Sequence, residues 1–127
     1  MTDNRIPSET RPGRMEPLAR LPVFLALDGK RAVLAGGSAA AAWKAELLSA
    51  AGARVDVYAA EVSDDMAAIV AEPPRGAVTV HARAWTPGDL AGAAVAIGAF
   101  DDDDAASAFA AVARAAGVPV NVIDRPA

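Results

Sequence analysis

The sequence contains no cysteine and only one histidine, His81, among its 127 residues. Disulfide bonds and thiolate metal sites are therefore excluded, and His81 cannot hold a metal ion without help from carboxylates. Aromatic side chains make up only 5% of the chain, and much of its 54% apolar content is alanine. We therefore expect a single domain with a thin, closely packed core in which the helices lie near a sheet.

The chain also lacks a long apolar run, an apolar signal core at its start and a basic cluster in its expected folded part. With a formal net charge of −4, nucleic acid is not an expected partner, nor is a membrane, and a cytoplasmic protein is the expectation. Residues 1–20 combine prolines and arginines with little to bury, which predicts a disordered leader, with a basic binding arm as the alternative. The folded domain is expected to span residues 21–127.

Residues 31–53 are the stretch around which the rest of the chain is organised. A short apolar strand, residues 32–35, runs into Gly36-Gly37-Ser38, and an alanine-rich helix continues from there to Gly52. A second strand, residues 54–59, follows at once. This order is typical of the first half of a dinucleotide-binding βαβ unit.

The turn after the first strand is suited to an anion, because a helix N-terminus offers unpaired N–H groups and the positive end of its dipole. Gly36 can make the tight bend, since it has no Cβ. The middle glycine of the usual G-x-G-x-x-G/A pattern is replaced by Ser38. Serine adds bulk where the backbone approaches a pyrophosphate, but also a hydroxyl that can bind a phosphate. The alternative is a plain strand-to-helix turn without a ligand.

The alternation of segments predicts an α/β domain with a Rossmann-like parallel sheet of about five strands in the order 3-2-1-4-5, and helices on both faces. Further helices are expected at residues 64–71 and 105–116, and further strands at 77–82, 93–99 and 118–123. Ligands bind beyond the carboxyl ends of parallel strands. The residues expected along that edge are Gly36 to Ala39, Ala60, Glu61, Phe100, Asp101 and Asp124.

Several charged residues allow more than one interpretation. Asp56 lies about 20 residues past Gly36, where a ribose-binding acid is expected, but in mid-strand, whereas Glu61 just past the strand end is better placed. His81 alternates with Val80 and is expected to face solvent. The run Asp101 to Asp104 suits a helix N-terminus better than a Mg²⁺ site.

Several segments in order resemble the N-terminal domain of siroheme synthases. They are Leu21-Pro22-Val23-Phe24, Ala35-Gly36-Gly37-Ser38 with Lys44 beyond it, Ala51-Gly52-Ala53, Ala99-Phe100-Asp101-Asp102 and Asn121-Val122-Ile123-Asp124. Such proteins oxidise precorrin-2 to sirohydrochlorin with NAD⁺ and then insert Fe²⁺ to give siroheme. The resemblance therefore implies a tetrapyrrole substrate, Fe²⁺ and a homodimer in the full-length protein. Together with the strand order, the resemblance predicts which residues bind the cofactor. They are Gly36, Gly37, Ser38, Ala39, Ala40, Ala60, Glu61 and Asp101.

The resemblance also implies that Asp124 is the catalytic carboxylate in both reactions, whereas no metal-ligating residue is expected. This sequence departs from the family at Ser38, Trp43 and Phe100, which are all expected on the NAD⁺ side. The family's dimerisation region and helical domain are absent from the sequence. Two alternatives follow: a non-catalytic Rossmann scaffold whose loop no longer binds NAD⁺, or a chelatase alone.

Overall fold

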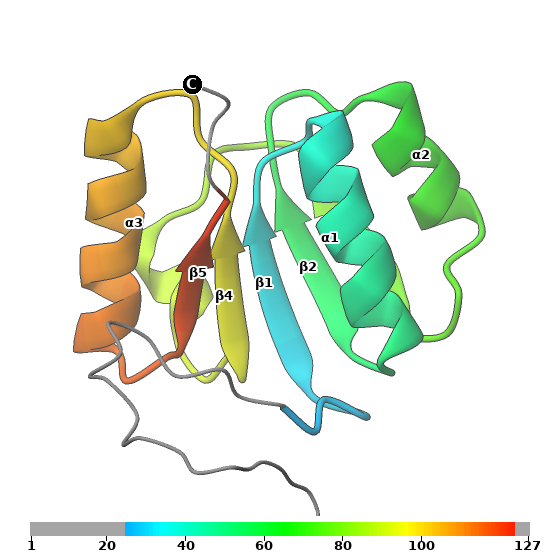
Figure 1. Cartoon of the computed structure of the whole chain (residues 1–127), viewed down its shortest axis with the longest axis horizontal. Coiled ribbons are helices and arrows are strands. Elements are labelled where there is room, and N and C mark those ends of the chain that lie inside the picture. Colours follow the sequence, from blue (N-terminus) through cyan, green and yellow to red (C-terminus); the bar gives the residue numbers. More distant parts are fainter. Residues whose placement is uncertain (1–24, 124–127) are drawn as a thin grey trace, which may run out of the picture.

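The computed structural model describes residues 25–123, in which five strands form one parallel sheet (Figure 1). The strand order β3-β2-β1-β4-β5 confirms the predicted topology. The predicted leader, residues 1–20, and Asp124 lie outside the described residues. The elements are β1 Arg31–Ala35, α1 Ala39–Ala50, β2 Arg54–Tyr58, α2 Asp64–Ala71, β3 Val78–His81, the 3₁₀ helix η1 Pro87–Leu90, β4 Val95–Gly98, α3 Asp103–Ala115 and β5 Val120–Val122.

The strands after β1 are shorter than predicted. Several residues next to them form hydrogen bonds to a neighbouring strand but lie outside the strand bounds. Pro119 has no N–H to donate, and only its carbonyl takes part, accepting from Ala96 N–H at 2.9 Å. Helix α3 begins earlier than predicted. Asp102 is its N-cap, accepting from Ala105 N–H at 2.7 Å, and Asp103 and Asp104 form its first turn. The helix-capping interpretation of the acidic run is therefore confirmed.

Each face of the sheet carries its own apolar core. On one face, Ala41 and Ala45 of α1 are fully buried together with Leu34 and Val57 of the sheet, and α2 adds Met66. Because alanine has only a methyl group, α1 can lie directly on the strands.

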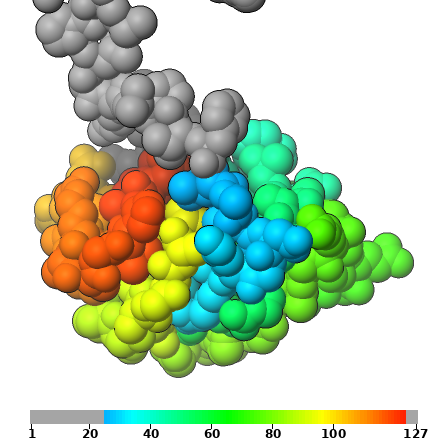
Figure 2. Space-filling model, turned by 90° about the horizontal axis from the view of Figure 1, so that it is seen from below, coloured from blue at the N-terminus to red at the C-terminus, as the bar shows by residue number. Residues whose placement is uncertain are grey.

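The opposite face is covered by α3 and η1. Phe109 of α3 and Leu90 of η1 are fully buried there, and Trp85 packs edge-on against Phe109 with ring centroids 5.1 Å apart. Seen from below (Figure 2), the colours run from orange and red through yellow and blue to green, in keeping with the strand order β5, β4, β1 and β2. Within residues 25–123, no helix is both long and apolar enough to cross a membrane.

The connection from β3 to β4, residues 82–94, is held to the sheet by Arg31. Its Nε donates to Asp56 Oδ2 at 2.7 Å, and its Nη2 donates to the Asp89 carbonyl at 2.8 Å and to Tyr58 Oη at 3.1 Å. One guanidinium thus joins β1, β2 and the η1 turn. Asp89 also forms a two-bond pair with Arg83 at 2.8 and 2.9 Å.

The strand pattern predicted that His81 faces solvent, but its side chain contacts two residues of β2. Its Nε2 lies 3.0 Å from Asp56 Oδ1, and its ring stacks on Tyr58 with centroids 4.6 Å apart. The side chain is 36% exposed. The prediction missed these contacts because they join residues on neighbouring strands. His81, Asp56 and Arg31 together form a polar network across three strands.

The pKa of Asp56 lies below its ordinary value. Partial burial by itself would raise it, but hydrogen bonds from His81 and Arg31 favour the charged carboxylate and outweigh burial. A lowered folded-state pKa means that the native state holds its proton less tightly than the unfolded chain does. The stabilisation from Asp56 is therefore fully present above the unfolded pKa, about 4, and is lost as the pH falls through the lowered folded-state value.

We predict that Asp56→Asn lowers the free energy of unfolding by about 1–3 kcal/mol at pH 7, because Arg31 keeps its partial burial but loses an ionic partner. Urea unfolding at pH 7, 5, 4 and 3 measures this loss, and the difference from the wild type should shrink below about pH 4. Asp28→Asn is the matched control. It breaks the Asp28–Arg75 pair, whose side chains are 72% and 58% exposed, so the change should stay within about 0.5 kcal/mol. Equal effects of both substitutions would contradict the prediction.

Candidate functional site

The turn from β1 into α1 needs glycine at its first position. Gly36 has a φ of 131°, a conformation that other residues rarely adopt. A Cβ there would lie 2.8 Å from the Ala99 carbonyl oxygen. The Gly36 N–H donates to the Tyr58 carbonyl at 3.0 Å. Gly36 therefore brings the end of β1 against the ends of β2 and β4.

Gly37 is where this loop touches the loop that leads from β2 to α2. A Cβ on Gly37 would collide with the Glu61 carbonyl oxygen and reach 3.0 Å from Val62 Cα. The Gly37 carbonyl accepts from the Ser63 N–H at 2.7 Å. The missing side chain therefore lets the two loops meet and fixes the start of α1 relative to the start of α2.

Ser38 is the N-cap of α1. Its Oγ accepts from the Ala41 N–H at 3.2 Å, and its carbonyl accepts from the Ala42 N–H at 2.9 Å. The N–H groups of Ala39 and Ala40, at the first two helical positions, have no intrahelical acceptor. They lie at the positive end of the helix dipole, where an anion is favoured.

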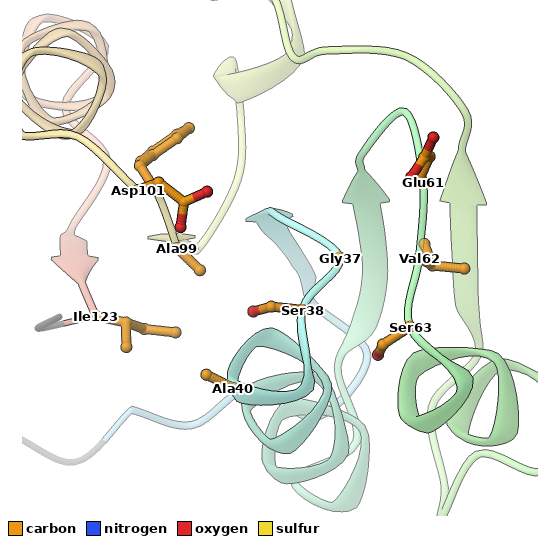
Figure 3. A pocket seen from close by; sticks show the side chains of 10 residues that line it. Gly37, Ser38, Ala40, Glu61, Val62, Ser63, Ala99, Asp101 and Ile123 are labelled. Atoms are coloured by element: carbon orange, nitrogen blue, oxygen red, sulfur yellow. The ribbon is translucent and has the colours of Figure 1, made fainter. Parts of the chain in front are cut away.

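A cleft of about 500 Å³ opens at the carboxyl edge of the sheet, between the β1–α1 turn and the ends of β2, β4 and β5. Figure 3 shows Ser38 between two walls, with Ala99, Asp101 and Ile123 on one side and Glu61 on the other. The lining residues are Gly37, Ser38, Ala40, Glu61, Val62, Ser63, Ala99, Phe100, Asp101 and Ile123.

Most of the predicted cofactor-binding residues line this cleft, and the others adjoin them in the chain. Gly37, Ser38, Ala40, Glu61 and Asp101 are lining residues, whereas Gly36, Ala39 and Ala60 are not. Asp124 is not described, but its neighbour Ile123 lines the cleft and donates its N–H to the Gly98 carbonyl at 2.8 Å.

Of the two acids considered for the ribose, only Glu61 lines the cleft. Asp56 is turned to the sheet face covered by α3 and is engaged by Arg31 and His81. Period-two alternation already places Asp56 on the same face as Tyr58. No cluster of three or more acidic or histidine side chains suitable for a metal ion occurs in residues 25–123.

Trp43 does not line the cleft, contrary to the expectation from the sequence. It is 59% exposed and lies on α1 beside a shallow groove against α2, with Lys44 Nζ 5.3 Å from its ring centroid. Residues four apart share a helix face, so Trp43 lies with Ala39 on the side toward α2. Ser38 and Phe100 are the two family departures that line the cleft.

Sequence reasoning missed four lining residues, Val62, Ser63, Ala99 and Ile123. Ser63 had a detectable signal as a helix cap, and its Oγ accepts from the Met66 N–H at 3.1 Å. The other three are apolar residues in the segments that follow β2, β4 and β5, and only their position in the topology indicates a role.

Comparison with known families shows which proteins this chain is related to. Residues 23–127 match the family described as "Putative NAD(P)-binding". The chain belongs to this NAD(P)-binding family. Over 107 residues, the NAD(P)-binding domain is 39% identical to the siroheme synthase of Ectopseudomonas mendocina (strain ymp) and 41% identical to that of Pseudomonas entomophila (strain L48). Over 106 residues, it is 36% identical to the siroheme synthase of Nitrosomonas europaea.

Each of these alignments covers 84% of this chain but 22% of the relative, in its N-terminal part. The chain thus spans about a fifth of the length of the curated relatives that it matches. Among solved structures, the precorrin-2 dehydrogenase SirC aligns with a TM-score of 0.63 and 20% identity, over 85% of this chain and 51% of that one. The likeness to SirC confirms the Rossmann-like fold.

The residues of the NAD(P)-binding domain fit the diphosphate of a dinucleotide. The N–H groups of Ala39 and Ala40 are suitable donors, and the first turn of α1 contains no acidic residue. Gly37, at the mouth of the turn, adds no side chain to the cleft. The switch point between β1 and β4 is also where ligands bind in open parallel sheets.

We predict that Gly37→Ala destabilises the domain by roughly 2 kcal/mol or more, because the new methyl group forces the two loops apart. Thermal unfolding measures the loss as a shift of several degrees in Tm. Gly88→Ala is the matched control, since a Cβ on Gly88 meets nothing within 4 Å. If Gly37→Ala unfolds at the same temperature as Gly88→Ala, the loop contact does not constrain the fold.

Proposed function

We propose that this domain binds NAD in the cleft and is the cofactor-binding part of an enzyme that oxidises precorrin-2 to sirohydrochlorin and inserts Fe²⁺ to give siroheme. The observation that carries the proposal is the first turn of α1, which opens into the cleft of an NAD(P)-binding family member. The siroheme synthase relatives and the SirC likeness support the pathway. We further propose a homodimer for the complete protein, as the family resemblance implies, and a cytoplasmic location, as expected from the sequence.

The two walls of the cleft suggest how the dinucleotide lies. With its diphosphate at Ala39 and Ala40, one half extends toward Glu61 and the other toward Asp101. We assign the adenosine half to the Glu61 side, because an acid after β2 accepts hydrogen bonds from ribose hydroxyls. The Glu61 carboxylate repels a 2′-phosphate, which favours NAD over NADP.

We assign Asp124 the role of catalytic carboxylate. It directly follows Ile123, which lines the cleft wall where the nicotinamide half is assigned. A carboxylate at that place can accept a proton from the tetrapyrrole during oxidation, and can help remove pyrrole protons when Fe²⁺, a substrate, is inserted. Bound NAD⁺ supplies the hydride acceptor.

We predict that the chain binds NAD⁺ at least tenfold more tightly than NADP⁺ in calorimetric titration, a difference of about 1.4 kcal/mol. Glu61→Gln should weaken NAD⁺ binding and narrow the preference, since the amide no longer repels a phosphate. Glu46→Gln is the charge-matched control. Glu46 is on α1 beside the α2 groove and outside the cleft, so both affinities should stay unchanged. Absence of NAD⁺ binding would overturn the cofactor proposal and favour the scaffold alternative.

We predict that Asp124→Asn lowers precorrin-2 oxidation and Fe²⁺ insertion by about 10²–10⁴-fold in a protein that joins this domain to the rest of a siroheme synthase. Absorbance of sirohydrochlorin and siroheme measures the two rates, and NAD⁺ affinity should be unchanged. Asp28→Asn, on the exposed turn before β1, should leave both rates intact. Normal turnover by Asp124→Asn would remove Asp124 from the mechanism, and metal insertion without any NAD⁺-dependent oxidation would favour the chelatase alternative.

A further inference from the structure

Helices α1 and α2 lie side by side on one face of the sheet (Figure 1), and a shallow groove runs between them. The groove has a volume of about 310 Å³ and shares no lining residue with the cofactor cleft. It is lined by three alanines and Ile69, together with Trp43, Glu46 and Asp65. Leu47 is exposed four residues after Trp43, so an apolar stripe continues from the groove along α1.

The groove combines an aromatic ring with two carboxylates, Glu46 and Asp65, that form no ion pair within residues 25–123. Lys44 Nζ lies 5.3 Å from the Trp43 ring centroid, so this ring already attracts a cation. Trp43 is 59% exposed, which leaves it accessible to another cation. A guanidinium group suits both features, because it stacks on aromatic faces and pairs with carboxylates.

A second copy of this chain is a poor occupant of the groove. In a symmetric pair, the groove would face its own counterpart. Glu46 and Asp65 would then lie against the same two carboxylates of the other copy, and like charges across an interface disfavour association. Acidic residues also outnumber basic ones across residues 25–123. An extended segment that carries arginine fits the groove better.

Residues 1–20 contain such a segment. They hold four arginines and three acidic residues, and the stretch Arg11-Pro12-Gly13-Arg14 has two of the arginines and no acid. A polyproline II helix has three residues per turn, so Arg11 and Arg14 would share one side of a chain in that conformation. Proline-containing segments of this kind dock in aromatic-lined grooves.

The described chain begins close enough to the groove for this segment to reach it. The Gly29 N–H donates to the Gly52 carbonyl at 2.9 Å, just past the end of α1. Trp43 lies nine residues before Gly52, roughly 14 Å along the helix axis. Leu27 is buried in the core beneath α1 and α2, so the chain enters the fold on the face that carries the groove. Ten residues separate Arg14 from the described chain, and fully extended they span up to roughly 33 Å.

We propose that residues 1–20 are a basic arm that docks into the α1–α2 groove of its own chain, with the guanidinium groups of Arg11 and Arg14 on Trp43 and on the groove carboxylates. The arm acts on a surface apart from the cofactor cleft, so this inference does not depend on NAD binding. It also gives a role to Trp43, which departs from the family pattern and does not line the cleft.

Paramagnetic broadening of amide signals in the full chain tests this docking. The chain has no cysteine, so Ser8→Cys carries a nitroxide label at a single position of the arm. At low salt, the label should broaden the backbone amide signals of Trp43 and Asp65 more than that of Ser107 on α3, which covers the opposite sheet face. Raising the salt to about 1 M should weaken this broadening, because the Debye length then falls to about 3 Å. Chemical reduction of the nitroxide gives the reference spectrum.

Substitutions in the groove should release the arm, as the Ala68 amide signal reports. Trp43→Ala removes the ring and should lower the ratio of docked to free arm about two- to fivefold. Asp65→Asn removes one carboxylate and should lower this ratio about twofold or more. Glu72→Gln is the charge-matched control, since Glu72 is the exposed C-cap of α2 and does not line the groove. Unchanged signals from buried Leu34 verify that each variant is folded.

Equal broadening on both faces of the sheet would overturn the proposal, and so would broadening that persists in both groove variants. The same conclusion follows if Arg11→Gln combined with Arg14→Gln leaves the pattern unchanged. A mixture of spin-labelled chain with isotope-enriched chain that carries no label tests whether the arm stays on its own copy. Broadening that survives in this mixture shows docking on another copy and overturns docking within one chain.

Discussion

The close approach between Gly37 and the backbone of Glu61 and Val62 is the constraint on which the cleft depends. No other residue type leaves room for it, and the hydrogen bond from Ser63 to the Gly37 carbonyl holds it in place. The consecutive helices α1 and α2 are thereby fixed with their N-termini at the same cleft. The same contact places the Glu61 carboxylate in the cleft into which the start of α1 opens.

On the sheet face that α3 covers, charged side chains join strands β1, β2 and β3. Arg31 reaches from the beginning of β1 to Asp56 on β2 and to the carbonyl of Asp89 in the β3–β4 connection. Asp56 binds His81 on β3 through its other oxygen. A single arginine thus ties down a connection whose helix, η1, is only four residues long. Asp56 of β2 and His81 of β3 are thereby held together within the sheet, away from the cleft.

Much of the fold could be predicted because each strand and helix has a local signal and parallel alternation permits few topologies. The glycine turn and Glu61 were predicted for the same reason, since strand ends meet at one edge. The orientation of Trp43 and the partners of His81 could not be predicted, because they depend on contacts between elements. Ala99 and Val62 carry no chemical signal, and they become lining residues only when the loops are assembled. The pairing of Asp56 with Arg31 joins residues 25 apart in sequence, which no local pattern reports.

The central position of β1 has a consequence for how the chain is made. Its partner on one side, β2, follows after the single helix α1. Its other partner, β4, begins only at Val95. During synthesis, one edge of β1 therefore stays unpaired until β4 has emerged from the ribosome. That edge is apolar, from Ala32 to Ala35, and an open apolar edge invites pairing with other nascent chains. The strand order therefore leaves this edge of β1 open until β4, which is far along the chain, has folded against it.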